Sequence, residues 1–424
     1  MNQNRFFKKN RNSIYPGIII IYFFIALFAS LIANEKPLFI SINGKHFFPA
    51  LSNNPYIELP GDDGIYKKIR TNNVDWKNLK TDRIIFPPVC WSPSRTDLLN
   101  TYSSPFARQQ YYQAEKISGL PTRFRHFLGT GKTGNDVLAG LIHGTRTSVS
   151  IGFFSMSIAL LLGIFLGGLA GYLGDDKLKI CRGHLIVLIL MIFPAWFYSF
   201  QLRFEILEES FSNSLWEGIF QSVVSIIIFI LLLMWPFILR FKSISFLNKK
   251  IFIPVDSIIS RFIEIFLSLP RLILILTIAA ISRPSILTII LIIGLTSWTE
   301  IARIMRAQIL QLRELNYIAA AKSYGTGTMK ILLRHLLPNA SSQILVIGTI
   351  GIASAILTET GLSFLGVGVP AGTATWGSLM FEAKENYEAW WLVIFTGITI
   401  FLLLSALYRQ GEILRSKDKK IVFY

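Results

Sequence analysis

The stretch HFLGTGKTGND, from His126 to Asp136, sets a lysine and a threonine among closely spaced glycines. A glycine-rich loop that ends in Gly-Lys-Thr can cradle the phosphates of a nucleotide, so this stretch raises the question of ATP binding. Such a loop also needs a glycine five residues before the glycine of the Gly-Lys-Thr. Counted back from Gly131, that position is His126, and no strong strand pattern comes before it. The stretch is therefore interpreted as a glycine-rich turn that leads into a helix.

Residues of other chemically active types are scattered along the chain. Cys90 and Cys181 show no metal-binding or redox spacing, and the five histidines form no cluster. The neighbours Asp175 and Asp176 are interpreted as a loop turn, which leaves no group of carboxylates suited to a membrane-bound transferase. The sequence thus predicts no catalytic residue, no cofactor site and no metal site.

The composition indicates a chain that lies mostly in a membrane. Of the 424 residues, 52% are hydrophobic, and the mean hydropathy is +0.50, which is unusual for a soluble domain. The net charge is +17. Because Lys and Arg gather in the cytoplasmic loops of membrane proteins, this charge does not call for a nucleic-acid partner.

Eight apolar runs are long enough to cross a hydrocarbon core of about 30 Å. They cover about residues 16–33, 148–174, 185–201, 219–239, 262–281, 286–304, 344–364 and 390–408. Both ends of the chain are basic, which places both in the cytoplasm and agrees with an even number of spans. In the second run, small residues recur at spacings that permit close helix contacts, namely Gly163, Gly167, Gly168 and Gly171.

The first apolar run is interpreted as an uncleaved helix. A signal peptide is the alternative, but the run is long, and Leu31 and Ala33 make a poor cleavage site. Residues 35–147 hold no run of membrane length and are expected outside the cytoplasm, with short strands in PLFISI and KHFFPAL. This segment either contacts a partner or forms a structural cap, and the sequence leaves both open.

A long cytoplasmic connection covers residues 314–343 and contains the stretch NYIAAAKSYGTGTMKILLRHLLPN. Residues 317–324 predict a short helix with three consecutive alanines, which Gly325 ends. Thr328 is expected to cap a second short helix that Pro338 stops. Alanine gains little by burial, so the small face favours the close approach of another protein over an ordinary connection between helices.

This connection resembles the coupling loop of ABC importer permeases, in which Glu-Ala-Ala, a glycine and His-x-Leu-Pro-Asn follow one another. The matching residues are Ala320, Ala321, Gly325, His335, Leu337, Pro338 and Asn339. The glutamate of that pattern falls on Ala319, which puts an ion pair from this position in doubt but not the docking itself. The stretch LGTGKTGNDVLAGLIHGTRTS, which follows Phe127, likewise resembles the start of the core in peptide-type permeases.

The resemblance covers about residues 128–415 and implies an all-α polytopic membrane protein with the type I ABC importer permease fold. An insertion near residues 182–254 would add two helices to the usual set, for about eight transmembrane helices. The expected parts are a cytoplasmic N-terminus with the first helix, a large extracytoplasmic segment, the permease core and a cytoplasmic tail. Their bounds are 1–34, 35–147, 148–411 and 412–424.

The resemblance also implies a division of labour. A second permease subunit would complete the path, two ATPase subunits would bind ATP and Mg²⁺, and an extracytoplasmic peptide-binding protein would deliver the substrate. This chain would be a non-catalytic permease of the bacterial inner membrane, in contact with lipid, that transmits ATPase motions through its coupling loop. The outer stretch LIANEKPLFISINGKHFFPAL resembles the oligopeptide and microcin C permeases. The substrate stays open among dipeptides, oligopeptides, peptide antibiotics and metal chelates.

Ionisable residues within the spans are expected on the translocation path, and the three candidates are Glu359, Glu264 and Arg271. For Glu359 the alternative is a packing contact with the neighbouring Thr358 or Thr360. A secondary transporter or channel for small peptides is the rival function. It needs no ATPase, but it predicts coupling carboxylates near the middle of the membrane, and it leaves the coupling-type loop unexplained.

Overall fold

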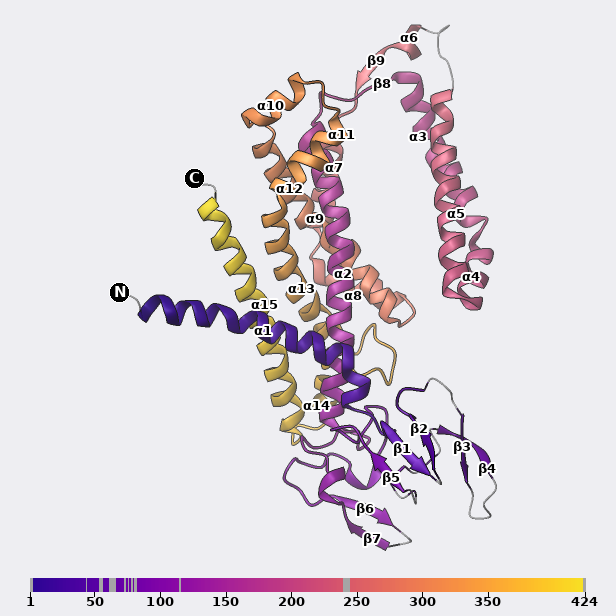
Figure 1. Ribbon diagram of the computed structural model, residues 1–424. Helices are drawn as coiled ribbons and strands as arrows, with labels where there is room; N and C mark the ends of the chain where they lie inside the picture. Colours follow the sequence, from indigo (N-terminus) through magenta and orange to yellow (C-terminus); the bar gives the residue numbers. More distant parts are fainter. Residues whose placement is uncertain are drawn as a thin grey trace. The chain divides into compact units, whose positions relative to one another are not determined.

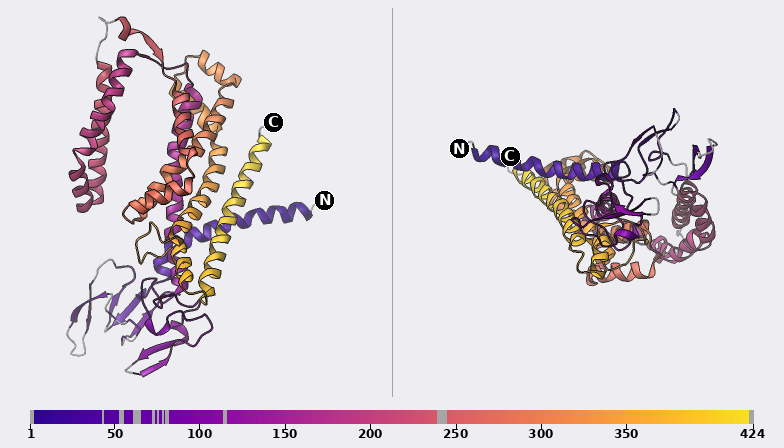
Figure 2. Two further views of the ribbon diagram at one scale, coloured as in Figure 1. Left: turned by 180° about the vertical axis from the view of Figure 1, so that it is seen from behind. Right: turned by 90° about the horizontal axis from the view of Figure 1, so that it is seen from below.

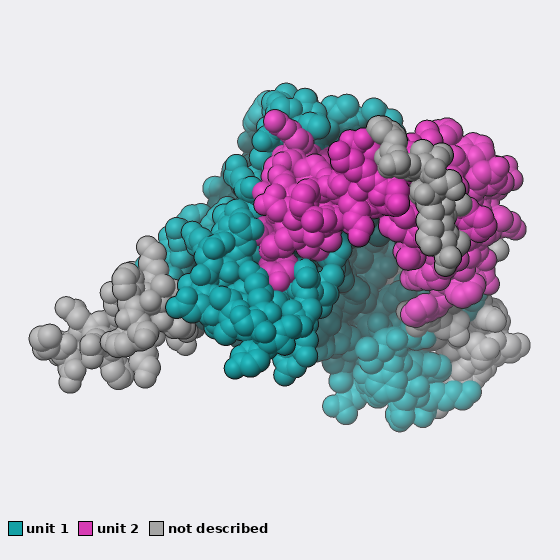
Figure 3. Space-filling model, turned by 90° about the horizontal axis from the view of Figure 1, so that it is seen from above, with its two compact units in different colours: residues 1–168, 263–424 teal, residues 169–262 magenta. Residues whose placement is uncertain are grey.

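The computed structural model of the chain is drawn in Figure 1. It describes residues 3–42, 44–52, 56–60, 66–71, 74, 76, 77, 79, 82–113, 116–238 and 245–421. The chain divides into two compact units, residues 1–168 together with 263–424, and residues 169–262, which Figure 3 colours separately. Helices make up most of both units, and the strands are short.

Seven helical segments among the described residues are long and apolar enough to cross a membrane. They are Ile14–Ile32, Val137–Leu173, Arg182–Ser210, Trp216–Phe237, Ile286–Leu312, Gln343–Phe364 and Trp390–Ser416. A bent pair of helices, α7 (Val255–Ser268) and α8 (Arg271–Ile281), makes an eighth if the pair is counted as one span. The expected set of about eight spans is thus recovered.

The span expected over residues 262–281 is a broken one in the structure. The chain bends by 80° between α7 and α8. Pro270 is the N-cap of α8, and it has no backbone N–H to continue a helix from α7. A proline also disfavours helical geometry in the residue before it, here Leu269. The bend is therefore explained by Pro270, which lies within the apolar run and does not interrupt its hydrophobic pattern.

In the larger unit, α2 (Val137–Leu173) packs closely on α9 (Ile286–Leu312). A methyl group added at Gly163 would lie 2.6 Å from Cβ of Ile301, and one at Gly167 would meet the backbone of Ala302. Both glycines are therefore required for the approach of the two helices, as their spacing predicted. Gly168 is less critical, because its nearest neighbour would lie at an ordinary 3.6 Å.

Helices α1 (Gln3–Ile32), α14 (Trp376–Glu385) and α15 (Trp390–Ile421) of this unit pack around Trp376, which is completely buried. Trp376 begins α14, and its indole lies edge-on to the ring of Tyr22 in α1. The hydroxyl of Tyr22 donates to the carbonyl oxygen of Thr399 in α15 at 2.8 Å. Helices α1 and α15 accordingly lie against each other (Figure 2), and α15 also packs on α13 (Ser341–Phe364).

The segment between α1 and α2 carries small antiparallel sheets. Strand β1 (Phe39–Ile42) lies between β2 (Lys45–Phe47) and β5 (Arg83–Ile85), with Ile40 opposite Phe47. The expected strands in PLFISI and KHFFPAL are therefore confirmed. Two hairpins follow the same pattern, β3 (Tyr56–Pro60) with β4 (Tyr66–Arg70) and β6 (Gln110–Gln113) with β7 (Lys116–Gly119). Helix α2 begins at Val137, earlier than the run expected from residue 148.

The smaller unit is a helical hairpin. Its long helices are α3 (Arg182–Trp196) and α5 (Leu215–Met234), and the acidic stretch between them is a further helix, α4 (Phe204–Asn213). Arg203 joins the arms by donating to Gln221 at 2.6 Å and to Ser225 at 3.1 Å. Strands β8 (Lys179–Cys181) and β9 (Lys250–Phe252) pair across the base of the hairpin.

Candidate functional site

The connection after α9 folds as two short helices joined by a glycine turn. Helix α10 (Asn316–Ser323) carries the three alanines, and α11 (Thr328–Ile331) follows the turn. Gly325 lies between them with φ of +71°, a backbone conformation that favours glycine. The predicted order of helix, glycine turn and helix is confirmed.

Two details of this prediction are wrong. Thr328 is the first residue of α11, and its N-cap is Gly327, which offers no side-chain hydrogen bond. Pro338 does not stop the helix, because a π-helical turn (Leu332–Leu336) comes first and Pro338 enters the first turn of α12 (Leu337–Asn339). A proline is tolerated in a first turn, where its missing N–H has no partner to lose.

One side of the loop is anchored in the protein, and the other is open. The anchoring side chains are buried: Ile318, Ile331, Leu332 and Leu336. On the open side, Ala319 and Ala320 are exposed, and Tyr324 is 89% exposed. A methyl group added at Gly325 would have no neighbour within 4 Å. The loop therefore presents a small-residue surface that the described part of this chain leaves uncovered.

The end of the coupling-type pattern closes the loop on itself. The side-chain amide of Asn339 donates to the carbonyl oxygen of His335 at 2.6 Å and to the hydroxyl of Tyr317 at 3.2 Å. Asn339 therefore ties the last turn back to α10. Leu337 is half-buried and Pro338 is exposed. The structure thus brings the predicted residues of the loop, from Ala319 to Asn339, into one continuous element.

Glu359 lies elsewhere, in the interior of the larger unit. Its side chain is fully buried in α13 and accepts hydrogen bonds from Ser148 of α2 at 2.7 Å and from Ser363 at 2.8 Å. Sequence reasoning considered Thr358 and Thr360 as partners, and their hydroxyls instead donate to backbone carbonyl oxygens of their own helix. These contacts are those of a residue that joins two helices.

Arg271 and Glu264, the other two path candidates, are separated by the bend between α7 and α8. Arg271 lines a cavity of about 430 Å³ and donates to the hydroxyl of Ser297 in α9 at 2.6 Å. Glu264 is exposed on α7 and is not among the residues of that lining. Its role on the path stays a prediction.

The cavity also contains charged residues that sequence reasoning missed, Glu300 of α9 and Arg415 of α15. A signal for Glu300 was present, since it interrupts the apolar run of residues 286–304. Arg415 was assigned to the basic tail of the chain. In the structure α15 extends to Ile421, and Arg415 becomes part of the cavity lining.

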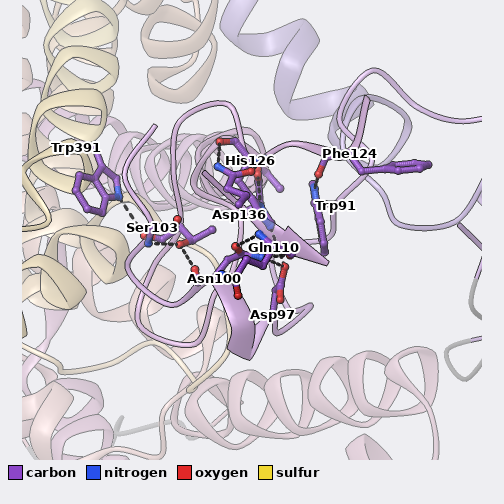
Figure 4. Close-up of polar contacts among 12 residues, drawn as sticks. Trp91, Asp97, Asn100, Ser103, Gln110, Phe124, His126, Asp136 and Trp391 are labelled. Atoms are coloured by element: carbon purple, nitrogen blue, oxygen red, sulfur yellow. Dashed lines mark hydrogen bonds and ion pairs between the residues drawn. The ribbon is translucent and has the colours of Figure 1, made fainter. Parts of the chain in front are cut away.

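The stretch that resembled a phosphate loop has a structural role (Figure 4). The His126 side chain is buried between two carboxylates, 2.9 Å from Asp136 and 3.3 Å from Asp97, and its ring stacks on Trp91. Burial alone would lower the pKa of His126, but the hydrogen bonds to the two carboxylates outweigh it and raise that pKa. Burial tends to raise the pKa of Asp97, but the bonds from His126 and Asn100 lower it.

The lysine of the Gly-Lys-Thr faces the carboxylates of α14. The backbone N–H of Lys132 donates to Glu382 at 3.1 Å, and its ammonium group pairs with Glu385 at 2.5 Å. Burial raises the pKa of Glu382, although hydrogen bonds from Lys132 and Asn135 oppose the shift. Neither contact resembles a phosphate site. In the described part of the chain, no group of three or more His, Cys, Asp or Glu residues is placed to hold a metal ion.

Comparison with known proteins places these features in a family context. Residues 244–416 match the family described as binding-protein-dependent transport system inner membrane component. The chain is 26% identical to the inner membrane ABC transporter permease protein YejE of Escherichia coli (strain K12), over 98% of this chain and 96% of that protein. It is also 26% identical to the peptidoglycan transport system permease protein YejE of Agrobacterium fabrum (strain C58), over 96% and 90%. The dipeptide transport system permease protein DppC of Bacillus subtilis (strain 168) is 26% identical over 69% and 68%.

Proposed function

Because residues 244–416 match the family of binding-protein-dependent transport system inner membrane components, we propose that this chain is the permease subunit of an ATP-driven importer of peptides. It is a multi-pass protein of the inner membrane and a non-catalytic part of its transporter. ATP and Mg²⁺ are bound by ATPase partners, and an extracytoplasmic binding protein supplies the substrate.

The uncovered face of the α10–α11 loop is the observation that carries the proposal. The loop is held from below by buried side chains such as Ile318 and Leu336, so a force applied to its open face reaches the membrane helices. Ala319, Ala320 and Gly325 lie on that face, where their small size lets a partner approach closely. We assign this face to the ATPase subunit as its docking surface.

Peptides are the proposed substrate class. The resemblance of the coupling loop and of the start of the core is to peptide-type permeases, and one relative is named for dipeptide transport. The likeness to the two YejE proteins spans almost the whole chain and so includes the outer segment. The oligopeptide and microcin C branch, indicated by the residues after Ala33, is proposed on the same ground.

The proposed assembly contains a second permease subunit and two ATPase subunits. Both termini of this chain are placed in the cytoplasm, because Lys and Arg are concentrated at both ends. The segment of residues 35–147 then lies outside, where its sheets can meet the binding protein. A secondary transporter would have no use for an exposed docking loop, so the importer is favoured over it.

The first experiment is to tag the chain, extract it in mild detergent and test whether an ATPase subunit co-purifies. Co-purification from native membranes supports the proposal. A chain that purifies without any ATPase, yet moves peptides in vesicles, would refute it and favour the secondary transporter. The same preparation also shows whether a second permease subunit is present.

A further inference from the structure

The cavity beside Arg271 collects charges that have no ion-pair partner among the described residues. Its lining includes two positive side chains, Arg271 and Arg415, and one negative side chain, Glu300. Within the described ranges of the sequence, none of the three forms an ion pair. Charged residues in a membrane-spanning region are costly and normally pair with each other or with a ligand. Arg271 is half-buried, and Glu300 and Arg415 are exposed, so their charged groups are accessible to a ligand that brings charges of its own.

Arg271 retains donors for such a ligand. One of its terminal nitrogens donates to Ser297, whose hydroxyl in turn donates to the carbonyl oxygen of Ile293. The Nε–H of Arg271 is buried and meets no acceptor among the described residues. A guanidinium carries five N–H donors, and an unsatisfied buried donor costs about 1–3 kcal/mol. Ser297 thus fixes the side chain of Arg271, while most of the N–H donors of Arg271 stay unused.

The rest of the lining fits a small organic ligand. Its volume of about 430 Å³ lies in the usual range of ligand pockets, about 300–1,000 Å³. Apolar and small residues line most of the wall, among them Met156, Ile304, Val346 and Gly351. A few charged groups in an apolar wall are the arrangement that orients a ligand.

We propose that this cavity is an internal substrate site for zwitterionic peptides, in which Arg271 binds the terminal carboxylate and Glu300 binds the terminal ammonium group. The inference rests on the proposed function and adds to it a selection step within the permease. A guanidinium pairs well with a carboxylate, because its donors match the two oxygens. Glu300 explains why the ligand carries both signs, since an anion alone would be repelled by it.

The test compares one peptide in three forms: with both termini free, with an amidated C-terminus, and with an acetylated N-terminus. ATP-dependent uptake is measured in cells that carry the complete transporter. For each form, uptake by a variant is divided by uptake by the wild type, so that selection by the binding protein cancels. Arg271→Gln should lower uptake of the free peptide about tenfold and leave the amidated form nearly unchanged. Glu300→Gln should likewise lower uptake of the free peptide about tenfold and leave uptake of the acetylated form nearly unchanged.

The controls separate a binding role from a structural one. Arg303 is an exposed residue of α9, the helix that carries Glu300, and it lies outside the cavity lining. Arg303→Gln should therefore change uptake only slightly, and by the same factor for all three forms of the peptide. Arg271→Lys keeps the charge and should retain part of the preference for the free carboxylate. The amount of tagged chain in the membrane and its co-purification with the ATPase are measured for every variant.

The outcomes are distinct. If Arg271→Gln and Glu300→Gln lower all three forms by the same factor, the charges serve folding or pair with a partner subunit, and the internal site is refuted while the importer stands. If the wild type takes up no form of the peptide in an ATP-dependent manner, both the site and the proposed function fall. Selective losses that match each blocked terminus establish the site.

Discussion

His126 donates from Nδ1 to the carboxylate of Asp136 at 2.9 Å, and the same carboxylate accepts from the backbone N–H of Ala139 at 2.7 Å. Asp136 precedes α2 and is the residue that caps it. The loop before α2 and the first turn of this long apolar helix are therefore held together by one side chain. This contact gives a stretch rich in glycine and charge a structural role.

We predict that the His126 contacts make stability depend on pH. The raised pKa of His126 adds free energy of unfolding that is fully present below its ordinary pKa of 6.5 and is lost as the pH rises through the raised value. The lowered pKa of Asp97 adds stability above 3.8 that is lost as the pH falls through the lowered value. The thermal midpoint of the detergent-solubilised chain should accordingly be higher at pH 6 than at pH 9.

His126→Gln should remove most of this dependence and cost about 3 kcal/mol at pH 6, because two carboxylates lose a buried partner. The ring of Trp91 stacks on His126, so the contribution of Trp91 to the fluorescence of the nine tryptophans should change. The matched control is His46→Gln, since His46 is exposed on β2. An unchanged difference between the two pH values in His126→Gln would contradict the prediction.

Gly325→Arg should abolish ATP-dependent uptake and the co-purification of the ATPase, while insertion in the membrane stays normal. The side chain would start from the uncovered face of the loop, where its Cβ would have no neighbour within 4 Å among the described residues, and it would obstruct a partner docked there. Gly325→Ala is the control for backbone strain at φ of +71°. It should cost about 1 kcal/mol and retain most uptake. Loss of uptake in both variants alike would assign the effect to the turn conformation.

Glu359→Gln tests the predicted path role against the contacts seen in α13. Since Ser148 and Ser363 both donate to Glu359, we expect a loss of about 1 kcal/mol and the same ratio of uptake for anionic, neutral and cationic peptides. Glu359→Leu removes both acceptors and should cost about 2–3 kcal/mol. A changed ratio in Glu359→Gln would place this residue on the path.

Gly167→Ala should destabilise the permease core by about 1–3 kcal/mol, because the added methyl group meets the backbone of Ala302 in α9. The neighbouring Gly168→Ala is the matched control. There the methyl has an ordinary contact with Leu332 at 3.6 Å, and Ala favours a helix more than Gly. Thermal melting of the two purified variants measures the difference. Equal midpoints would show that α2 and α9 separate without cost.

Much of this architecture could be predicted from local patterns. Apolar runs located the spans, and the glycine spacing in α2 anticipated the contacts of Gly163 and Gly167. The order of helix, turn and helix in the loop between α9 and α13 was predictable, because alanine favours a helix and glycine favours a turn at its own position in the chain. Such features depend on short stretches of chain, which sequence alone can report.

Other features depend on residues far apart in the sequence. The partners of Glu359 include Ser148, which is 211 positions away. Arg271 of α8 and Glu300 of α9 line one cavity, and the apolar runs of the sequence do not reveal that these two helices place them there. The π-helical turn before Pro338 buries Leu332 and Leu336, and the sequence pattern of this stretch predicted a simple stop instead.

The continuity of the chain through Pro338 has a mechanical consequence. Hydrogen bonds from Ala340 to Leu336 and from Ile344 to Ala340 bridge the junction, so α11, α12 and α13 succeed one another without an extended residue. The backbone thus keeps helical geometry from Thr328, through the π-helical turn and Pro338, to Phe364. If an ATPase subunit docks on the small-residue face, as we propose, its movement would reach α13 through this helical junction, and Glu359 of α13 accepts a hydrogen bond from Ser148 of α2.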